Sequence, residues 1–219
     1  MLGQIKKGNN KQHKGQSFIE LALVLSLLIF MLLGVVEFGY LLNEYITLVE
    51  GTRETARYLS PFIFVNEDGT LNTNVYLNGV GHMIGGTIEI EGTLRVISPE
   101  TSSLWPITLD PSPEIRDDIV ISVFSIDNSG NLVRYPDDDG YSHLGNQGSK
   151  FTNEEIAAKL VSGAPSSGAV LVEVFYHYHQ ILNLLEGWTG PIPVHTYSIM
   201  PLSGAEPTAT SIAAPPPSP

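Results

Sequence analysis

The sequence predicts an α+β protein in which one long N-terminal helix, first transmembrane and then amphipathic, packs on a small antiparallel sheet. Residues 21–36 form a run of 16 residues without a charge, and apolar residues then recur at helical spacing up to Pro61. Several later segments alternate between apolar and polar residues, as strands do. A chain of 219 residues has room for one medium domain plus such an appendage.

Composition excludes several classes of protein. The chain has 11 Lys and Arg residues against 23 Asp and Glu residues, a formal net charge of −12. No nucleic-acid partner is expected, because neutralising phosphates requires a basic surface. Cysteine is absent, which excludes disulfides, thiolate nucleophiles and Cys-ligated zinc.

The apolar run is interpreted as a single membrane-spanning helix. As a helix, Phe18 to Leu42 exceeds the thickness of a hydrocarbon core of about 30 Å. Residues 1–15 carry four lysines and no acid, whereas the rest of the chain is strongly acidic. The positive-inside rule therefore predicts a cytoplasmic N-terminus and an extracytoplasmic C-terminal domain in a single-pass protein of the cytoplasmic membrane.

Two other interpretations of the run compete with a membrane anchor. A cleaved secretory signal also has a basic start and an apolar middle, but no small-x-small site follows this run. A buried helix of a soluble core is the second alternative. All sides of the helix are apolar for four turns, which favours lipid over a core.

The start of the run carries the most specific motif. Glu20 stands at the mouth of the apolar helix, where a carboxylate is costly. The stretch from Gly15 to Glu20 resembles a type IV prepilin processing site, in which a prepilin peptidase cuts after a glycine. The resemblance implies that residues 1–15 are a removed leader, Gln16 is the first mature residue and Glu20 is the fifth. The implied role of Glu20 is to pair with an N-terminal ammonium, its own or a neighbour's, in a low dielectric. The alternative is that Glu20 simply lies at the level of the lipid headgroups.

Three blocks in order resemble the TadE-like family, pseudopilins of tight-adherence (Flp-type) pilus systems. They are residues 15–25, 34–39 and 53–58. Many relatives have a proline at the position of Ser26, and small residues are common where Gly51 and Thr55 stand. The resemblance implies a bacterial protein with three partners: a prepilin peptidase, other pilins or pseudopilins, and the Tad secretion platform. Membrane lipid is the further partner that the apolar run predicts.

The helix is expected to continue beyond the membrane as a stalk. Apolar positions recur from Leu41 to Leu59, and Pro61 ends the pattern. The predicted rod, residues 17–60, is about 66 Å long at the helical rise. Glu37, Arg53 and Arg57 are candidate contacts with a pilin partner; the alternative for the two arginines is a solvated helix face.

The expected head covers residues 61–200 and follows the anchor and stalk of residues 16–60. The glycines at 79, 81, 85 and 86 predict a flexible join, and residues 98–114 a loop. Thr152 to Glu155 form a capping box before a short helix ending near Gly163. The Pro-rich tail, residues 201–219, is expected to be disordered. Strands are predicted at residues 87–97 (or a hairpin around Gly92), 118–126, 131–135 after a turn at 127–130, 169–180, and 193–200 at an edge.

Candidate chemistry in the head is sparse. His177 and His179 share one face of the 169–180 strand with Glu173, and could bind a metal with His195 from the next strand. The alternative is an exposed sheet face. Residues 137–139 are three aspartates that could hold Ca²⁺ or form an ordinary acidic turn. No nucleophile elbow, phosphate loop or His-Glu-x-x-His motif is present, so neither catalysis nor a cofactor or metal is expected.

The favoured hypothesis is a minor pseudopilin, a structural or assembly component of a Tad/Flp-type pilus at the membrane or cell surface. The first alternative is a binding module that the same helix tethers permanently to the membrane, outside any filament. The second is a surface metal-dependent enzyme that uses the histidine face.

Overall fold

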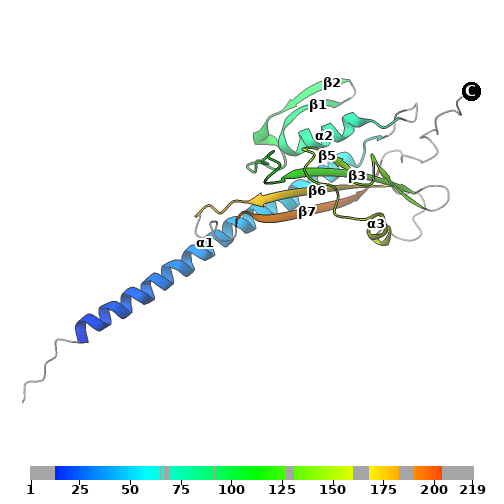
Figure 1. The fold of residues 1–219 in the computed structure, drawn as a ribbon. Coiled ribbons are helices and arrows are strands. Elements are labelled where there is room, and N and C mark those ends of the chain that lie inside the picture. The colour runs from blue at the N-terminus through cyan, green and yellow to red at the C-terminus, as the bar shows by residue number, and fades with distance from the viewer. Residues whose placement is uncertain are drawn as a thin grey trace, which may run out of the picture.

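The structure is a computed structural model and describes residues 13–64, 66, 70–90, 92–126, 131–159, 168–182 and 190–203. One helix, α1 (His13–Leu59), projects far beyond a head that combines sheet and helices (Figure 1). The predicted α+β class with a long N-terminal helix is confirmed. The leader up to residue 12 and the tail from residue 204 lie outside the described residues.

The C-terminal half of α1 packs on the head through the amphipathic face that the sequence predicts. Leu48, Thr52, Ala56 and Leu59 are fully buried, whereas Tyr45, expected on the same face, is exposed. The helix ends just before Pro61, which lacks the N–H needed to continue it. Ser60 then ties this end to the C-terminal part of the head, because its hydroxyl donates to the Pro201 carbonyl at 2.6 Å.

The main sheet has five antiparallel strands. They are β3 (Asp118–Ile126), β4 (Leu132–Tyr135), β5 (Tyr141–Ser142), β6 (Ala169–Tyr178) and β7 (Ile192–Pro201). Their order is β4-β3-β6-β7, with β5 also pairing with β3, so β7, which contains Pro193, is at an edge as predicted. The predicted turn at residues 127–130 lies outside the described residues.

Both faces of β6 are covered. Val170, Val172 and Val174 pack into the core with α1, as the alternation predicts. On the other face Leu171 packs with Phe124 and with Ile156 of α3 (Asn153–Lys159). The alternative of an exposed sheet face is therefore wrong for Glu173, which is fully buried. The predicted capping box is confirmed: Thr152 N–H donates to Glu155 Oε2 at 3.0 Å, and Glu155 N–H to Thr152 Oγ1 at 3.3 Å.

The glycine cluster is not a flexible join. Residues 73–84 form α2 (Thr73–Ile84), followed by the hairpin of β1 (Gly86–Ile90) and β2 (Thr93–Ile97) around Gly92; residues 99–101 form a short 3₁₀ turn in the predicted loop. A Cβ at Gly79 would lie 2.8 Å from Leu59 Cδ1, and one at Gly81 would lie 2.5 Å from Ile88 Cγ2. The two helical glycines therefore let α2 approach α1 and β1 closely, which outweighs their low helix propensity.

A buried carboxylate organises the loop that joins β5 to α3. Asp118 is fully buried, and its two oxygens accept five hydrogen bonds. The donors are the N–H groups of Ile119, Leu144, Asn146 and Gln147 and the hydroxyl of Ser142. The loop therefore takes its shape from one anion rather than from an apolar core.

Candidate functional site at the N-terminal helix

Gln16 and Glu20 lie one helical turn apart at the free end of α1. Gln16 Nε2 donates to Glu20 Oε1 at 3.1 Å, and both side chains are exposed. Gly15 belongs to the same helix. Further along the helix, the Ser26 hydroxyl donates to the Ala22 carbonyl at 2.7 Å. The helix therefore runs without a break past the proposed processing residues.

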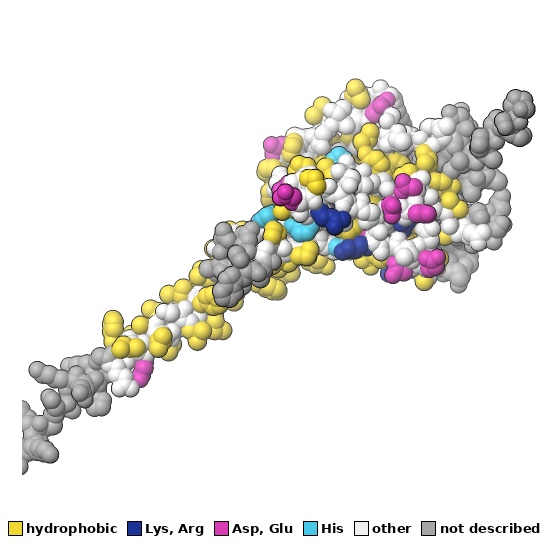
Figure 2. Space-filling view, viewed as in Figure 1, with side chains coloured by type: hydrophobic (Ala, Val, Ile, Leu, Met, Phe, Trp, Pro, Cys, Tyr) yellow, Lys and Arg dark blue, Asp and Glu magenta, His cyan; other side chains and the backbone are white. Residues whose placement is uncertain are grey.

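From Gln16 to Val36 the helix projects free of the head. Every side chain in this range is exposed except Leu33, which is half-buried. Figure 2 shows hydrophobic side chains along the projecting part. These 21 residues are about 31 Å long at the helical rise, which matches a hydrocarbon core of about 30 Å. Within the described ranges, α1 is long and apolar enough to cross a membrane. No part of its most apolar window is buried, whereas the helix of a soluble core would be mostly buried.

Among the described residues, the hydrogen bonds between the head and α1 begin at Glu37, directly after this free segment. The Tyr178 hydroxyl donates to Glu37 Oε1 at 2.6 Å. The N–H groups of Ile181 and Leu182 donate to the two carboxylate oxygens at 2.9 Å each. Burial, followed by the hydrogen bond to Glu37, raises the pKa of Tyr178, so the phenol remains a donor at neutral pH.

A second carboxylate repeats the contact two turns further along α1. The Tyr176 hydroxyl donates to Glu44 Oε2 at 2.9 Å. Tyr176 and Tyr178 point to the same face of β6 because strand side chains alternate, and Glu37 and Glu44 share one face of α1 because seven residues make two helical turns. We name these four residues the head–helix junction. It fixes the head against the helix just above the apolar segment.

Sequence reasoning did not predict this junction, although it left a signal. Two acids seven residues apart follow an apolar run, and two tyrosines occur two residues apart on the apolar face of a strand. Of the predicted partner contacts, Glu37 is engaged within the chain, while Arg53 and Arg57 are exposed on the stalk. Their contact with another subunit stays a prediction.

Three of the four candidate metal ligands of the head, Glu173, His177 and His195, take part in two separate side-chain pairs, and the fourth, His179, is in neither pair. His177 Nδ1 lies 2.9 Å from Asp117 Oδ1, and His195 Nε2 lies 3.0 Å from Glu173 Oε1. Among the described residues no three His, Asp or Glu side chains are grouped to hold a metal ion. In the acidic turn, Asp137 Oδ1 accepts the N–H of Asp139 at 3.1 Å and the Asp138 carbonyl accepts from Arg134, an arrangement typical of a turn.

Comparison with known families identifies the helix. Residues 15–57 match the model of the TadE-like protein family. The match runs from Gly15 through the apolar segment and most of the stalk, and it confirms the resemblance found in the sequence. No match was found among curated proteins, and none among solved structures. The TadE-like family is associated with pilus systems, and the head lies outside the matched segment.

Replacing Glu37 with alanine is expected to release the end of β6 from the helix. The Ile181 and Leu182 N–H groups lose their acceptors, and hydrogen bonds to a charged group contribute about 1.5–3 kcal/mol each at most, less where water reaches them. Hydrogen exchange of these two amides should accelerate at least tenfold. Glu50→Ala, an exposed acid on the same helix, is the matched control and should leave both rates unchanged. Equal protection in Glu37→Ala and wild type would contradict the junction.

Proposed function

We propose that this protein is a minor pseudopilin, a structural or assembly component of a Tad/Flp-type pilus that a prepilin peptidase processes. The observation that carries the proposal is the free apolar end of α1, which presents Glu20 five residues after Gly15 within the TadE-like match. An exposed apolar rod of this length is costly in water and stable in lipid or between similar rods.

Cleavage after Gly15 would remove all four lysines of the leader and leave the ammonium of Gln16 next to the apolar helix. The carboxylate of Glu20 then supplies the countercharge to this ammonium, either in its own chain or in a neighbouring subunit. At the edge of lipid the effective dielectric constant is low, so an unpaired carboxylate there is unfavourable and a paired one attractive. Gln16 already contacts Glu20 across one turn, which supports pairing at that position.

The free segment would store the subunit in the cytoplasmic membrane, with the head outside, until it joins other pilins or pseudopilins at the Tad secretion platform. Head-to-tail association of this kind produces open helical assemblies rather than closed rings. The head–helix junction supports this division, because it holds the head at the base of the apolar segment and leaves residues 16–36 uncovered.

The N-terminus of the mature protein tests the proposal. Mass spectrometry of protein purified from its native membrane should find a chain that begins at Gln16. In Gly15→Leu the bulky side chain should block the peptidase and leave the leader attached, while Ser26→Ala is processed normally. A wild-type chain that retains its leader contradicts processing and favours the permanently tethered binding module.

A further inference from the structure

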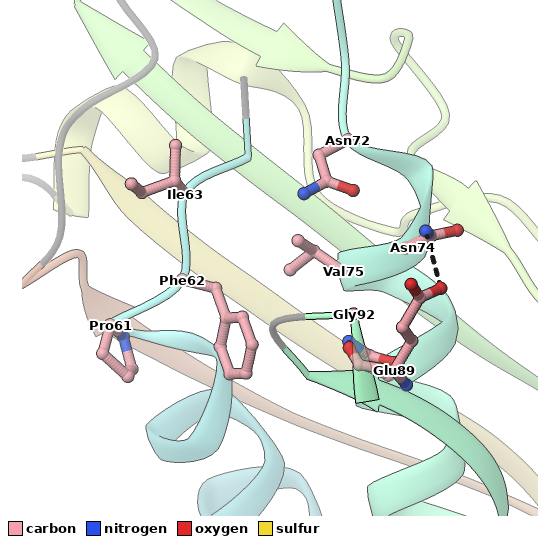
Figure 3. Close-up of a pocket in the computed structure, with 9 residues that line it drawn as sticks. Pro61, Phe62, Ile63, Asn72, Asn74, Val75, Glu89 and Gly92 are labelled. Atoms are coloured by element: carbon pink, nitrogen blue, oxygen red, sulfur yellow. Dashed lines mark hydrogen bonds between the residues drawn. The ribbon is translucent and has the colours of Figure 1, made fainter. Parts of the chain in front are cut away.

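A cleft of about 510 Å³ opens in the head next to the C-terminal end of α1 (Figure 3). It lies where α1 ends, α2 begins and β1 runs past. This places it about 66 Å along the helix from the apolar end, since α1 runs 44 residues from Gln16 to Leu59. The lining residues combine an apolar side with amides and one carboxylate: Pro61, Phe62, Ile63, Asn72, Asn74, Val75, Asn78, Glu89 and Gly92.

One amide holds the walls of the cleft together. Asn78 is buried, its Nδ2 donates to the backbone carbonyl of Glu89, and its Oδ1 accepts the Glu89 N–H at 2.7 Å. This pair of hydrogen bonds joins α2 to β1 as a strand neighbour would. The cleft is therefore preformed, as binding sites for small molecules usually are.

Three polar side chains remain available to a ligand. Asn74 Nδ2 donates to Glu89 Oε2 at 3.3 Å, and among the described residues Asn74 Oδ1 and Glu89 Oε1 have no hydrogen-bond donor. Asn72 occupies the N-cap of α2 but makes no side-chain cap hydrogen bond, and within the described part of the chain its amide has no hydrogen-bond partner. Figure 3 shows this amide directed toward the space between α2 and residues 61–63. The side chain of an N-cap asparagine normally accepts a hydrogen bond from its own helix, and Asn72 does not make this bond.

The opposite wall is apolar. Phe62 is half-buried, with its ring centroid 5.0 Å from that of Tyr58, and faces the cleft beside the buried Val75. Ile63, next to Phe62 in the chain, is 55% exposed. A ligand that fits must therefore present an apolar face to Phe62 and hydrogen-bonding groups to the amides.

We propose that this cleft binds a neutral saccharide of one or two sugar rings. Sugar hydroxyls both donate and accept hydrogen bonds, as do the carboxamides of Asn72 and Asn74, and Glu89 accepts from a hydroxyl. The C–H face of a pyranose ring is flat and apolar and matches Phe62. No basic residue is among the described lining residues, and the chain carries a net charge of −12, so phosphorylated or otherwise anionic ligands are disfavoured. The site lies outside the TadE-like segment and does not depend on the proposed function.

Saturation-transfer NMR on the full chain in phosphocholine detergent tests this proposal, since such micelles contain no sugar head group. Cellobiose and N,N′-diacetylchitobiose are the probes; the acetamido groups of the second can also pair with the Asn72 amide. We expect at least one of them to bind with a Kd of about 1 mM or tighter. If neither disaccharide shows saturation transfer at about ten times that concentration, the proposal is overturned.

Variants locate the binding within the molecule. Asn72→Ala removes a side chain that makes no hydrogen bond to any described residue, so the fold should be retained, and each lost hydrogen bond to the sugar should weaken binding about fivefold. Phe62→Ala should abolish the transfer of saturation to the C–H protons of the sugar ring. Asn43→Ala, the same change at an exposed site on α1, is the matched control and should bind as wild type does. Binding that survives both Asn72→Ala and Phe62→Ala would place the sugar elsewhere and overturn the assignment.

Discussion

Replacing Asp118 with alanine is expected to lower the free energy of unfolding of the head by about 3–5 kcal/mol. The carboxylate is fully buried at the start of β3 and accepts five hydrogen bonds, three of them from N–H groups of residues 144–147. Alanine leaves these donors without an acceptor, and the cost of an unsatisfied buried donor exceeds the gain from the original bond. The loop after β5 should then lose the contacts that hold it against the start of β3.

Chemical denaturation of the full chain in detergent, followed by near-ultraviolet circular dichroism, measures this loss. Asp138→Ala removes the same carboxylate from an exposed turn position and keeps the backbone carbonyl that Arg134 contacts, so its midpoint should match wild type. Asp118→Asn retains the size of the side chain and should fall between the two, because an amide has only one acceptor oxygen. Equal midpoints for Asp118→Ala and Asp138→Ala would show that water, rather than Asp118, can accept the hydrogen bonds of the N–H groups in the loop.

The sequence predicted those parts of the fold that local patterns determine. The uncharged run and the stalk periodicity predict α1, and alternation predicts β3 and β6, because each pattern reflects burial of one face within a single element. Pro193 predicts the edge position of β7, since proline has no N–H and cannot pair on both sides; Pro201, expected in the disordered tail, is the last residue of this strand. The processing motif is equally local: Gly15, Gln16 and Glu20 fall within two helical turns.

The missed features depend on contacts between distant segments. Gly79 and Gly81 indicate a flexible segment by propensity, yet they lie in the helix α2. Leu59 and Ile88 leave no room for a larger residue at these two positions, which only the tertiary structure reveals. Glu37 and Tyr178 are 141 residues apart, so only the register of β6 against α1 reveals their hydrogen bond. The same holds for Glu173 and His195, which the sequence grouped as metal ligands and the structure pairs with each other.

Glu20→Ala is expected to remain inserted in the membrane but to lose association with partner pilins. The apolar run is unchanged, so insertion persists, and removing a costly charge from its edge even favours it. Association instead depends on the attraction between a carboxylate and an ammonium, about 4 kcal/mol at 4 Å and an effective dielectric constant of about 20. Losing even 1.4 kcal/mol of this attraction reduces the associated fraction tenfold when association is weak.

Cysteine crosslinking makes this prediction measurable, because the natural chain has no cysteine. Leu28→Cys or Val35→Cys introduces one thiol on the exposed face of the free segment, 61% and 70% exposed respectively. With a matching cysteine in a partner pilin, oxidation should yield at least tenfold less adduct in Glu20→Ala than in the parent, while alkaline extraction leaves both in the membrane. Glu50→Ala, an exposed acid on the stalk, should crosslink as the parent does. Undiminished adduct in Glu20→Ala would refute the role assigned to Glu20, whereas loss of adduct in both variants would mean that total charge, rather than the carboxylate at position 20, controls association.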